Sequence, residues 1–143
     1  MKESILKFSK QFLYEPEIIN PSSLIRARKG RYIVVGMGGS HLAADLMRIF
    51  NPELDLIVYS SYGLPRMKDS ELKKHLIILS SYSGNTEEVI DAFYAAKKQN
   101  CATVVIAAGG SLLELAEEYG VPYIKLPDTG TQPRMALGFS VMA

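Results

Sequence analysis

Residues 76–99, LIILSSYSGNTEEVIDAFYAAKKQ, place an apolar run, a polar loop and a helical segment one after another. The run Leu76 to Ser80 is short and continuously apolar up to its last residue, which is typical of a strand buried on both faces. The segment from Thr86 to Gln99 has the length and composition of a helix. This stretch therefore predicts a buried strand whose carboxyl end delivers a polar loop to the start of a helix.

The same order recurs along the chain. Further apolar runs rich in Val or Ile are found at Tyr32 to Val35, Leu56 to Tyr59, Thr103 to Ala107 and Tyr123 to Leu126. Helical segments are expected at about Ser40 to Phe50, Ser111 to Tyr119 and, as a short turn, Ser70 to Lys74. Strands that alternate with helices imply right-handed crossovers and a parallel sheet covered on both sides. We predict an α/β fold, a doubly wound five-stranded parallel sheet flanked by helices, with its ligand beyond the carboxyl ends of the strands.

The two ends of the chain lie outside this alternation. Ile5, Phe8 and Phe12 recur at helical spacing, so the first fourteen residues predict an amphipathic helix that ends before Pro16 and packs on another element. We assign residues 1–30 to this helix and its connection, and residues 31–130 to the α/β domain. Residues 131–143 have an apolar ending, and we expect them to begin a further helix.

Composition excludes several classes of protein. The 16 Lys and Arg residues against 15 Asp and Glu leave a net charge of +1, so no global field attracts nucleic acid or an acidic membrane surface. The single cysteine, Cys101, excludes an internal disulfide and a multi-cysteine zinc site. No apolar run is long enough for a signal sequence or a membrane helix. We expect a cytoplasmic protein with no metal, cofactor, nucleic-acid or membrane partner.

The first strand ends in a glycine-rich loop, Gly36-Met37-Gly38-Gly39-Ser40-His41, which runs directly into a helix. Glycines let the backbone approach a ligand, and a helix N-terminus offers unpaired N–H groups to an anion. A dinucleotide such as NAD(P) is the competing ligand. Its G-x-G-x-x-G motif needs glycine where this chain has His41, and an acidic residue is missing where the second strand ends at Tyr59-Ser60.

The third strand ends in Ser80-Ser81-Tyr82-Ser83-Gly84-Asn85-Thr86-Glu87-Glu88. Several hydroxyls beside a glycine can surround a phosphate with neutral donors, and the following helix dipole adds a favourable field. The alternative is that Asn85 or Thr86 only caps the helix, with Glu87 and Glu88 in its first turn. Capping leaves Ser81 and Ser83 unexplained, so we favour a phosphate site.

These loops resemble the paired loops of SIS (sugar isomerase) domains. The segment Thr131-Gln-Pro-Arg-Met-Ala-Leu-Gly138 resembles the one that distinguishes the bifunctional phosphoglucose/phosphomannose isomerases within that superfamily. The resemblance implies phosphate-binding hydroxyls at Ser40, Ser81, Ser83 and Thr86, supporting glycines at Gly38, Gly39 and Gly84, and a catalytic arginine at Arg134. A guanidinium suits a developing oxyanion because it is planar and always charged.

The resemblance also implies a function. Such enzymes interconvert glucose 6-phosphate or mannose 6-phosphate with fructose 6-phosphate, and they take their glutamate base and ring-opening histidine from a second SIS domain. We therefore expect an N-terminal SIS domain, a linking helix that begins in residues 131–143, a sugar-phosphate ligand and a homodimer. The segment alone is expected to be inactive, because Glu87, Glu88 and His75 all have adequate structural explanations.

Two alternatives and one departure stay open at this point. SIS domains also serve as non-catalytic sugar-phosphate sensors in regulators, and a phosphoheptose-type isomerase uses a similar loop pair in a one-domain oligomer. Family members usually carry a further glycine where this chain has His41, which weakens the assignment of Ser40 more than the others. His41 is an acid or base candidate, but a structural or solvent-facing role is favoured.

Overall fold

The structure, a computed structural model, describes residues 6–26, 30–130 and 132–143. Its centre is a six-stranded sheet in the order β1-β6-β5-β4-β2-β3, in which every pair is parallel except β1 with β6. The strands are β1 (Ile18–Ile19), β2 (Arg31–Val35), β3 (Asp55–Tyr59), β4 (Leu76–Ser80), β5 (Thr103–Ala107) and β6 (Tyr123–Lys125). All five parallel strands were predicted, each within a residue of its bounds.

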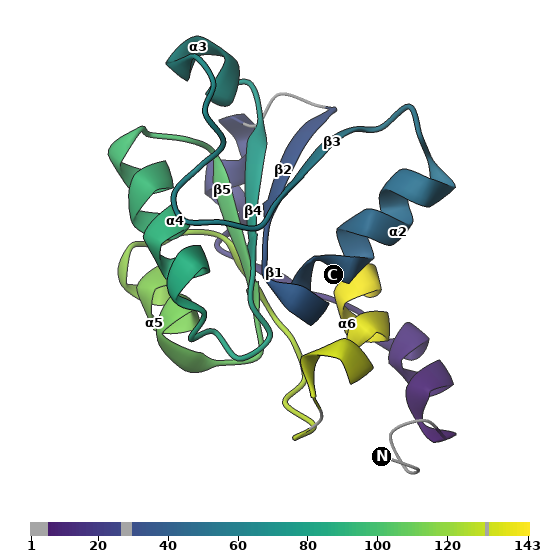
Figure 1. The fold of residues 1–143 in the computed structure, drawn as a ribbon. Helices are drawn as coiled ribbons and strands as arrows, with labels where there is room; N and C mark the ends of the chain where they lie inside the picture. The colour runs from purple at the N-terminus through teal and green to yellow at the C-terminus, as the bar shows by residue number, and fades with distance from the viewer. Residues whose placement is uncertain (1–5, 27–29, 131) are drawn as a thin grey trace.

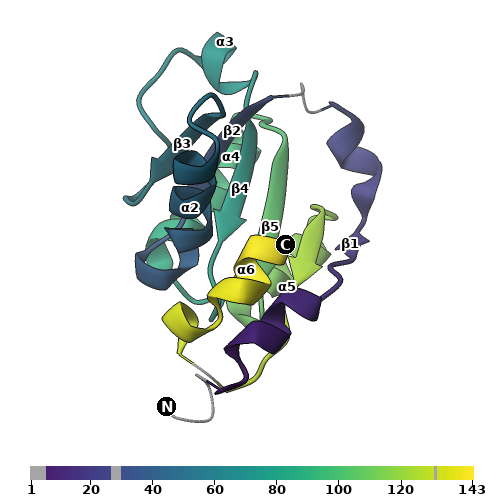
Figure 2. The ribbon, with the colours of Figure 1, turned by 90° about the vertical axis from the view of Figure 1, so that its right-hand side faces the viewer.

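Helices connect the strands. The α-helices are α2 (Leu42–Phe50), α3 (Asp69–Leu72), α4 (Glu87–Lys98), α5 (Gly110–Glu118) and α6 (Leu137–Met142). Short 3-10 helices are η1 (Phe8–Leu13), η2 (Pro21–Arg26), η3 (Gly38–His41) and η4 (Pro133–Met135). The helices α4 and α5 cover one face of the sheet, and α2 and α6 lie over the other (Figures 1 and 2). The predicted α/β class with helices on both faces is confirmed.

The strand order reverses once, between β2 and β4. The chain runs outward from β2 to β3 at one edge and then returns to place β4 on the other side of β2, after which β5 and β6 follow in order. The helix that joins β2 to β3 (α2) consequently lies on one face of the sheet, and the helices that join β4, β5 and β6 (α4 and α5) lie on the other (Figure 1). In doubly wound sheets the ligand lies at this reversal, beyond the carboxyl ends of the strands. The loops after β2 and β4 therefore flank the expected binding position.

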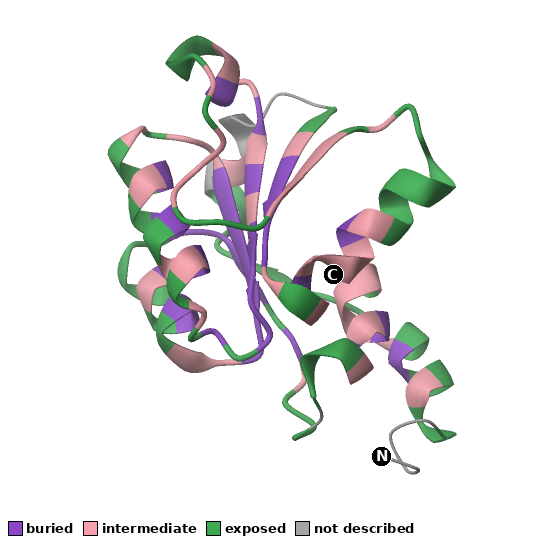
Figure 3. Cartoon of the chain, viewed as in Figure 1, coloured by how far each residue is buried: buried purple, intermediate pink, exposed green. Residues whose placement is uncertain are grey.

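The hydrophobic core is divided by the sheet. Alternate residues of a strand point to opposite faces, so Ile77 and Leu79 of β4 belong to the larger cluster under α4 and α5, whose centre is the fully buried Phe93. Ile78 faces the smaller cluster on the side of α6. Figure 3 shows the central strand β5 and much of β4 buried, whereas β3 is intermediate and much of α2 is exposed. The α4 and α5 face is thus the better packed of the two.

The sixth strand was not predicted. Ile18 and Ile19 pair antiparallel with Ile124 and Tyr123 at the edge of the sheet, and both isoleucines are exposed. Two residues are too few to show an alternating pattern, and exposure removes the apolar bias that identifies a buried strand. The sheet is therefore six-stranded and mixed, as an antiparallel edge on a parallel sheet commonly is.

The N-terminal segment differs from its predicted form. Between Phe8 and Leu13 it is a 3-10 helix, and Ile5 lies outside the described residues. Phe12, expected on the packing face, is 44% exposed, and the buried residue is Gln11. The Gln11 amide group bonds at both ends, donating to the Met135 carbonyl (2.6 Å) and accepting from the Gly138 N–H (2.9 Å). The segment does pack on another element, as predicted, and that element is α6. The contact is made by Gln11, which satisfies polar backbone groups at the start of α6.

No helix in the described part of the chain has the length and apolar character needed to cross a membrane.

Candidate functional site

The loop after β4 is held by its own hydroxyl groups. Ser81, which is 1% exposed, accepts a hydrogen bond from the Gly84 N–H (3.1 Å), and its hydroxyl lies 2.8 Å from that of Thr86. Ser83 sits at the exposed tip, where it accepts from the Asn85 N–H (3.3 Å). Three of the four predicted phosphate-binding hydroxyls therefore share one compact turn, with Ser81 inside it and Ser83 and Thr86 toward solvent.

The same loop is fixed against the start of α5. Gly84 has a φ of +71°, and a Cβ atom there would collide with the Gly109 carbonyl oxygen. The Gly84 carbonyl accepts from Leu112 N–H (2.8 Å), and the Asn85 side-chain oxygen accepts from Ser111 N–H (3.0 Å). Gly84 thus allows a close backbone approach, and the loop supplies acceptors to the first turn of α5.

The capping alternative considered for this loop is wrong in its detail. Thr86 occupies the N-cap position of α4, but it makes no side-chain capping bond, because its hydroxyl pairs with Ser81. Asn85 caps a helix, but that helix is α5. Val89 and Ile90 donate to the Thr86 carbonyl, as at any helix start. The N–H groups of the first turn of α4 therefore have no capping side chain, which is the condition for receiving an anion.

The loop after β2 meets the loop after β4 through Ser40. Ser40 is buried, its hydroxyl oxygen accepts from the Tyr82 N–H (3.1 Å), and its carbonyl accepts from the Ser80 hydroxyl (2.8 Å). The hydroxyl proton of Ser40 is left to donate elsewhere. Ser40 joins the two loops, and its predicted contact with phosphate would use that remaining proton.

The two supporting glycines of the first loop differ from each other. Gly38 has a φ of +54° and faces open space, so it is needed for its backbone conformation. Gly39 faces the backbone of Pro133 and Arg134. Arg134 itself is exposed in η4, directly after Pro133, which opens that short helix. The structure therefore brings Arg134 to the glycine-rich loop.

Acidic side chains surround the first turn of α4. The hydroxyl of Tyr62 donates to the Glu87 carboxylate (3.3 Å). The negative charge of Glu88, with burial and Glu87 as smaller causes, raises the pKa of Tyr62. Tyr62 therefore stays a protonated donor, and Glu87 is engaged by it. An anion at this helix start would depend on backbone N–H groups, hydroxyls and Arg134 to offset these carboxylates.

The two histidines and the cysteine have structural partners. The Nδ1 atom of His41 lies 2.6 Å from a carboxylate oxygen of Asp45, one turn along α2. His75 is buried at the far end of the sheet, with its Nδ1 atom 2.9 Å from the Glu71 carbonyl oxygen. Burial raises the pKa of the Cys101 thiol, which packs against the larger core cluster. Of these three, His41 alone lies in the candidate site.

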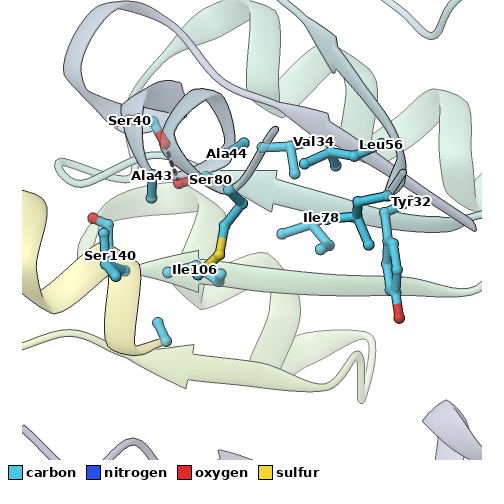
Figure 4. A pocket seen from close by; sticks show the side chains of 14 residues that line it. Tyr32, Val34, Ser40, Ala43, Ala44, Leu56, Ile78, Ser80, Ile106 and Ser140 are labelled. Atoms are coloured by element: carbon cyan, nitrogen blue, oxygen red, sulfur yellow. Dashed lines mark hydrogen bonds between the residues drawn. The ribbon is translucent and has the colours of Figure 1, made fainter. Parts of the chain in front are cut away.

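An apolar hollow of about 330 Å³ lies beside the site, between α2, α6 and the sheet. Figure 4 shows Tyr32, Val34 and Ile78 along its floor, with Ser140 on the α6 side. Ser40 and Ser80 reach its edge, but they are bonded to each other there. The hollow is too apolar to recognise a phosphate, and we separate it from the candidate site.

The described residues contain no group of three or more His, Cys, Asp or Glu side chains that could hold a metal ion. The candidate site is built of hydroxyls, backbone N–H groups and one guanidinium. Together with the single reversal of strand order, these features define a doubly wound α/β domain with a candidate anion-binding site at its switch point.

Comparisons with known proteins agree with this class. No family model matches the sequence. The bifunctional phosphoglucose/phosphomannose isomerase of Caldicellulosiruptor bescii is 39% identical over 98% of the chain, and that of Thermoplasma volcanium is 30% identical over 96%. The chain spans 42% and 43% of these two relatives. A Listeria monocytogenes structure described as a sugar-phosphate isomerase shares the fold, with a TM-score of 0.63 and 15% identity over 99% of this chain and 82% of its own.

The chain belongs to the family of the bifunctional phosphoglucose/phosphomannose isomerases. The resemblance predicted from the loop motifs is confirmed.

Proposed function

We propose that the chain is the N-terminal phosphosugar-binding domain of an isomerase that interconverts glucose 6-phosphate or mannose 6-phosphate with fructose 6-phosphate. The observation that carries the proposal is the turn from Ser81 to Thr86, in which the exposed Ser83 and the half-buried Thr86 place their hydroxyls at a helix start without a capping side chain. This arrangement suits a phosphate monoester, because it offers several neutral donors and a helix dipole at one point. The names of the sequence relatives support the same substrate class.

In this proposal the hydroxyls of Ser83 and Thr86 and the N–H groups of the first turn of α4 bind the phosphate. Ser81 shapes the turn and orients Thr86, since its oxygen already accepts from Gly84. Ser40 donates its remaining proton from the neighbouring loop. Binding the phosphate at the switch point leaves the sugar carbons to extend toward the first loop, beside which Arg134 lies.

The reaction transfers a proton between two carbons. A base removes the C2 proton of the open-chain aldose phosphate, and an enediolate forms as negative charge moves onto oxygen. Return of a proton to C1, with transfer of the O2 hydroxyl proton to O1, gives the ketose. Arg134 is the residue we assign to the enediolate, because a guanidinium stays charged as the oxyanion develops. We place the base and the ring-opening group in a second SIS domain of the whole protein, and the start of a linking helix in residues 131–143.

Isothermal titration with fructose 6-phosphate tests the proposal. Replacing Ser83 and Thr86 together by alanine removes two donors and should weaken binding by about tenfold or more. Tyr94→Phe, an exposed change on α4 outside the site, is the matched control and should bind as the unaltered chain does. Unchanged affinity in the double variant would remove the phosphate assignment.

We also propose a homodimer in the cytoplasm, acting in carbohydrate metabolism. The support for association is an apolar surface on α2, where Leu46, Ile49 and Phe50 are exposed beside the hollow. Phe50 is 89% exposed, and contiguous apolar patches of this kind are typical of protein interfaces. The cytoplasmic location rests on the single unpaired cysteine and on a phosphorylated substrate.

A further inference from the structure

Tyr82 is hydrogen-bonded to the three loops that follow the parallel strands β2, β5 and β6. Its N–H donates to the Ser40 hydroxyl oxygen (3.1 Å), and its carbonyl accepts from the Ala108 N–H (3.0 Å). Its side-chain hydroxyl donates to the Pro127 carbonyl (3.1 Å) and accepts from the Thr129 N–H (3.3 Å). The sequence does not distinguish this residue, because its neighbours Ser81 and Ser83 carry the motif.

The position of the Tyr82 hydroxyl is fixed. The residue is 7% exposed, and its ring packs in the smaller core cluster with Ile106, Leu126 and Ala136. A hydroxyl that both donates and accepts at set positions cannot rotate to suit another partner. The ring therefore transmits the placement of the phosphate-binding turn to residues 127–130, more than forty positions along the chain.

The segment held by Tyr82 leads into the arginine. Asp128 closes a short turn by accepting from the Gly130 N–H (3.1 Å). The chain then enters η4, where Pro133 and Arg134 lie against Gly39. The backbone of Arg134 is thus contacted by the glycine-rich loop, and Tyr82 holds the chain five residues before it, at Thr129. The Arg134 side chain is exposed. The position from which its guanidinium extends is therefore set by the backbone of η4.

We propose that Tyr82 is a positioning residue that couples the phosphate-binding turn to Arg134. The inference rests on the function proposed above, and it assigns separate roles to residues of the same site. Ser83 and Thr86 recognise the phosphate, whereas the Tyr82 hydroxyl places the guanidinium for the charge that develops at the opposite end of the sugar chain, on the oxygens of C1 and C2. Loss of that hydroxyl leaves phosphate recognition intact and weakens recognition of the enediolate.

Three ligands separate these effects in the 143-residue chain. Inorganic phosphate probes the turn alone, fructose 6-phosphate adds the sugar, and a five-carbon aldonate 5-phosphate carries a carboxylate where the enediolate charge would form. Tyr82→Phe should weaken aldonate phosphate binding about five- to tenfold, because small misplacement of a charged group is costly. The affinity for inorganic phosphate should change by less than about twofold, since the residues that bind phosphate are unaltered. In an Arg134→Ala background, Tyr82→Phe should cause no further loss for the aldonate.

Tyr59→Phe is the matched control, because it also removes a hydroxyl that bonds to a carbonyl in the following loop, at Tyr62 (3.0 Å). It should leave all three affinities unchanged. Equal weakening of all three ligands by Tyr82→Phe, or equal loss with and without Arg134, would overturn the coupling and leave Tyr82 a purely structural residue.

Amide hydrogen exchange without ligand keeps the two proposals distinguishable. Tyr82→Phe should accelerate exchange at Thr129 and Gly130 by about tenfold or more, while Ser81 and Gly84 keep their protection. If the unaltered chain binds none of the three ligands, the proposed function fails. The exchange pattern then still tests whether the Tyr82 hydroxyl holds residues 127–130 in place. Unchanged exchange at Thr129 would overturn it.

Discussion

Gly39 and Arg134 lie backbone against backbone. A Cβ atom on Gly39 would come within 2.7 Å of the Arg134 nitrogen and 3.0 Å of its Cα atom. The glycine that the motif predicted for ligand approach thus makes room for the arginine segment. Two loops that are almost a hundred residues apart in sequence are in this way brought to one side of the site.

Gly39→Ala should therefore displace η4, whereas Gly38→Ala should not. The first change overpacks a backbone contact and should lower the free energy of unfolding by about 1–3 kcal/mol. The second strains a positive φ in open space and should cost about 1–2 kcal/mol without moving Arg134. Denaturant unfolding gives both energies. Titration with an aldonate 5-phosphate should show weakened binding for Gly39→Ala only, and equal affinities for the two variants would contradict the assignment.

Ser81 and Ser83 should separate stability from binding. Ser81 is buried and accepts from Gly84, so Ser81→Ala should lower the free energy of unfolding by about 1 kcal/mol. Ser83 is exposed, so Ser83→Ala should leave stability within about 0.5 kcal/mol and weaken phosphate binding severalfold. Thermal unfolding and phosphate titration on the same samples check both. A stable Ser81→Ala chain would show that the buried bond is not needed for the turn.

Asn85 should behave as the cap of α5. Asn85→Ala removes the acceptor for Ser111 N–H and should cost about 1 kcal/mol. Asn85→Asp keeps an acceptor and adds a charge that suits the helix dipole, so it should retain most of the stability near neutral pH. The higher stability of Asn85→Asp relative to Asn85→Ala should disappear as the pH falls and the new carboxylate is protonated. Urea unfolding at neutral and acidic pH measures the stability of both variants. An equal loss of unfolding free energy in the two variants at neutral pH would exclude capping by Asn85.

The sequence predicted what depends on local pattern. The five parallel strands were identified because they are continuous apolar runs, and the loops that carry the predicted site lie together, as expected, because parallel strands bring their carboxyl ends to one edge of the sheet. The contacts of Gln11, Gly39 and Tyr82 could not be predicted. Each depends on the three-dimensional position of a distant backbone group, and none has a composition or spacing that differs from an ordinary helix, loop or core residue.

Self-association should depend on α2. Replacing Ile49 and Phe50 by serine removes the most exposed apolar side chains of that helix, and sedimentation should change from a dimer to a monomer. Tyr94→Ser, which removes an exposed aromatic from α4 on the opposite face of the sheet, should leave the dimer intact. A monomeric unaltered chain at high concentration would count against the proposed homodimer, and a dimer in the double variant would place its interface elsewhere.

The 143-residue chain should bind sugar phosphate without isomerising it at an enzyme-like rate. Its described residues supply hydroxyls, helix N–H groups and Arg134, but no well-placed base accompanies them. Glu87 is bonded to Tyr62, His75 is buried at the other end of the sheet, and the Nδ1 atom of His41 is held by Asp45. General acid–base catalysis contributes about 10² to 10⁴-fold in typical enzymes, so losing both proton-transfer groups should leave very little turnover.

A coupled assay that converts fructose 6-phosphate to glucose 6-phosphate measures this, run beside Arg134→Ala and His41→Asn. Titration of the same samples should show that binding persists in the unaltered chain, because the turn from Ser81 to Thr86 is complete within this domain. Robust turnover that Arg134→Ala abolishes would show that the domain contains its own base. Loss of that turnover in His41→Asn would then identify the histidine, which ends the glycine-rich loop. Binding without turnover would leave the base in a second domain, where the family resemblance assigns it.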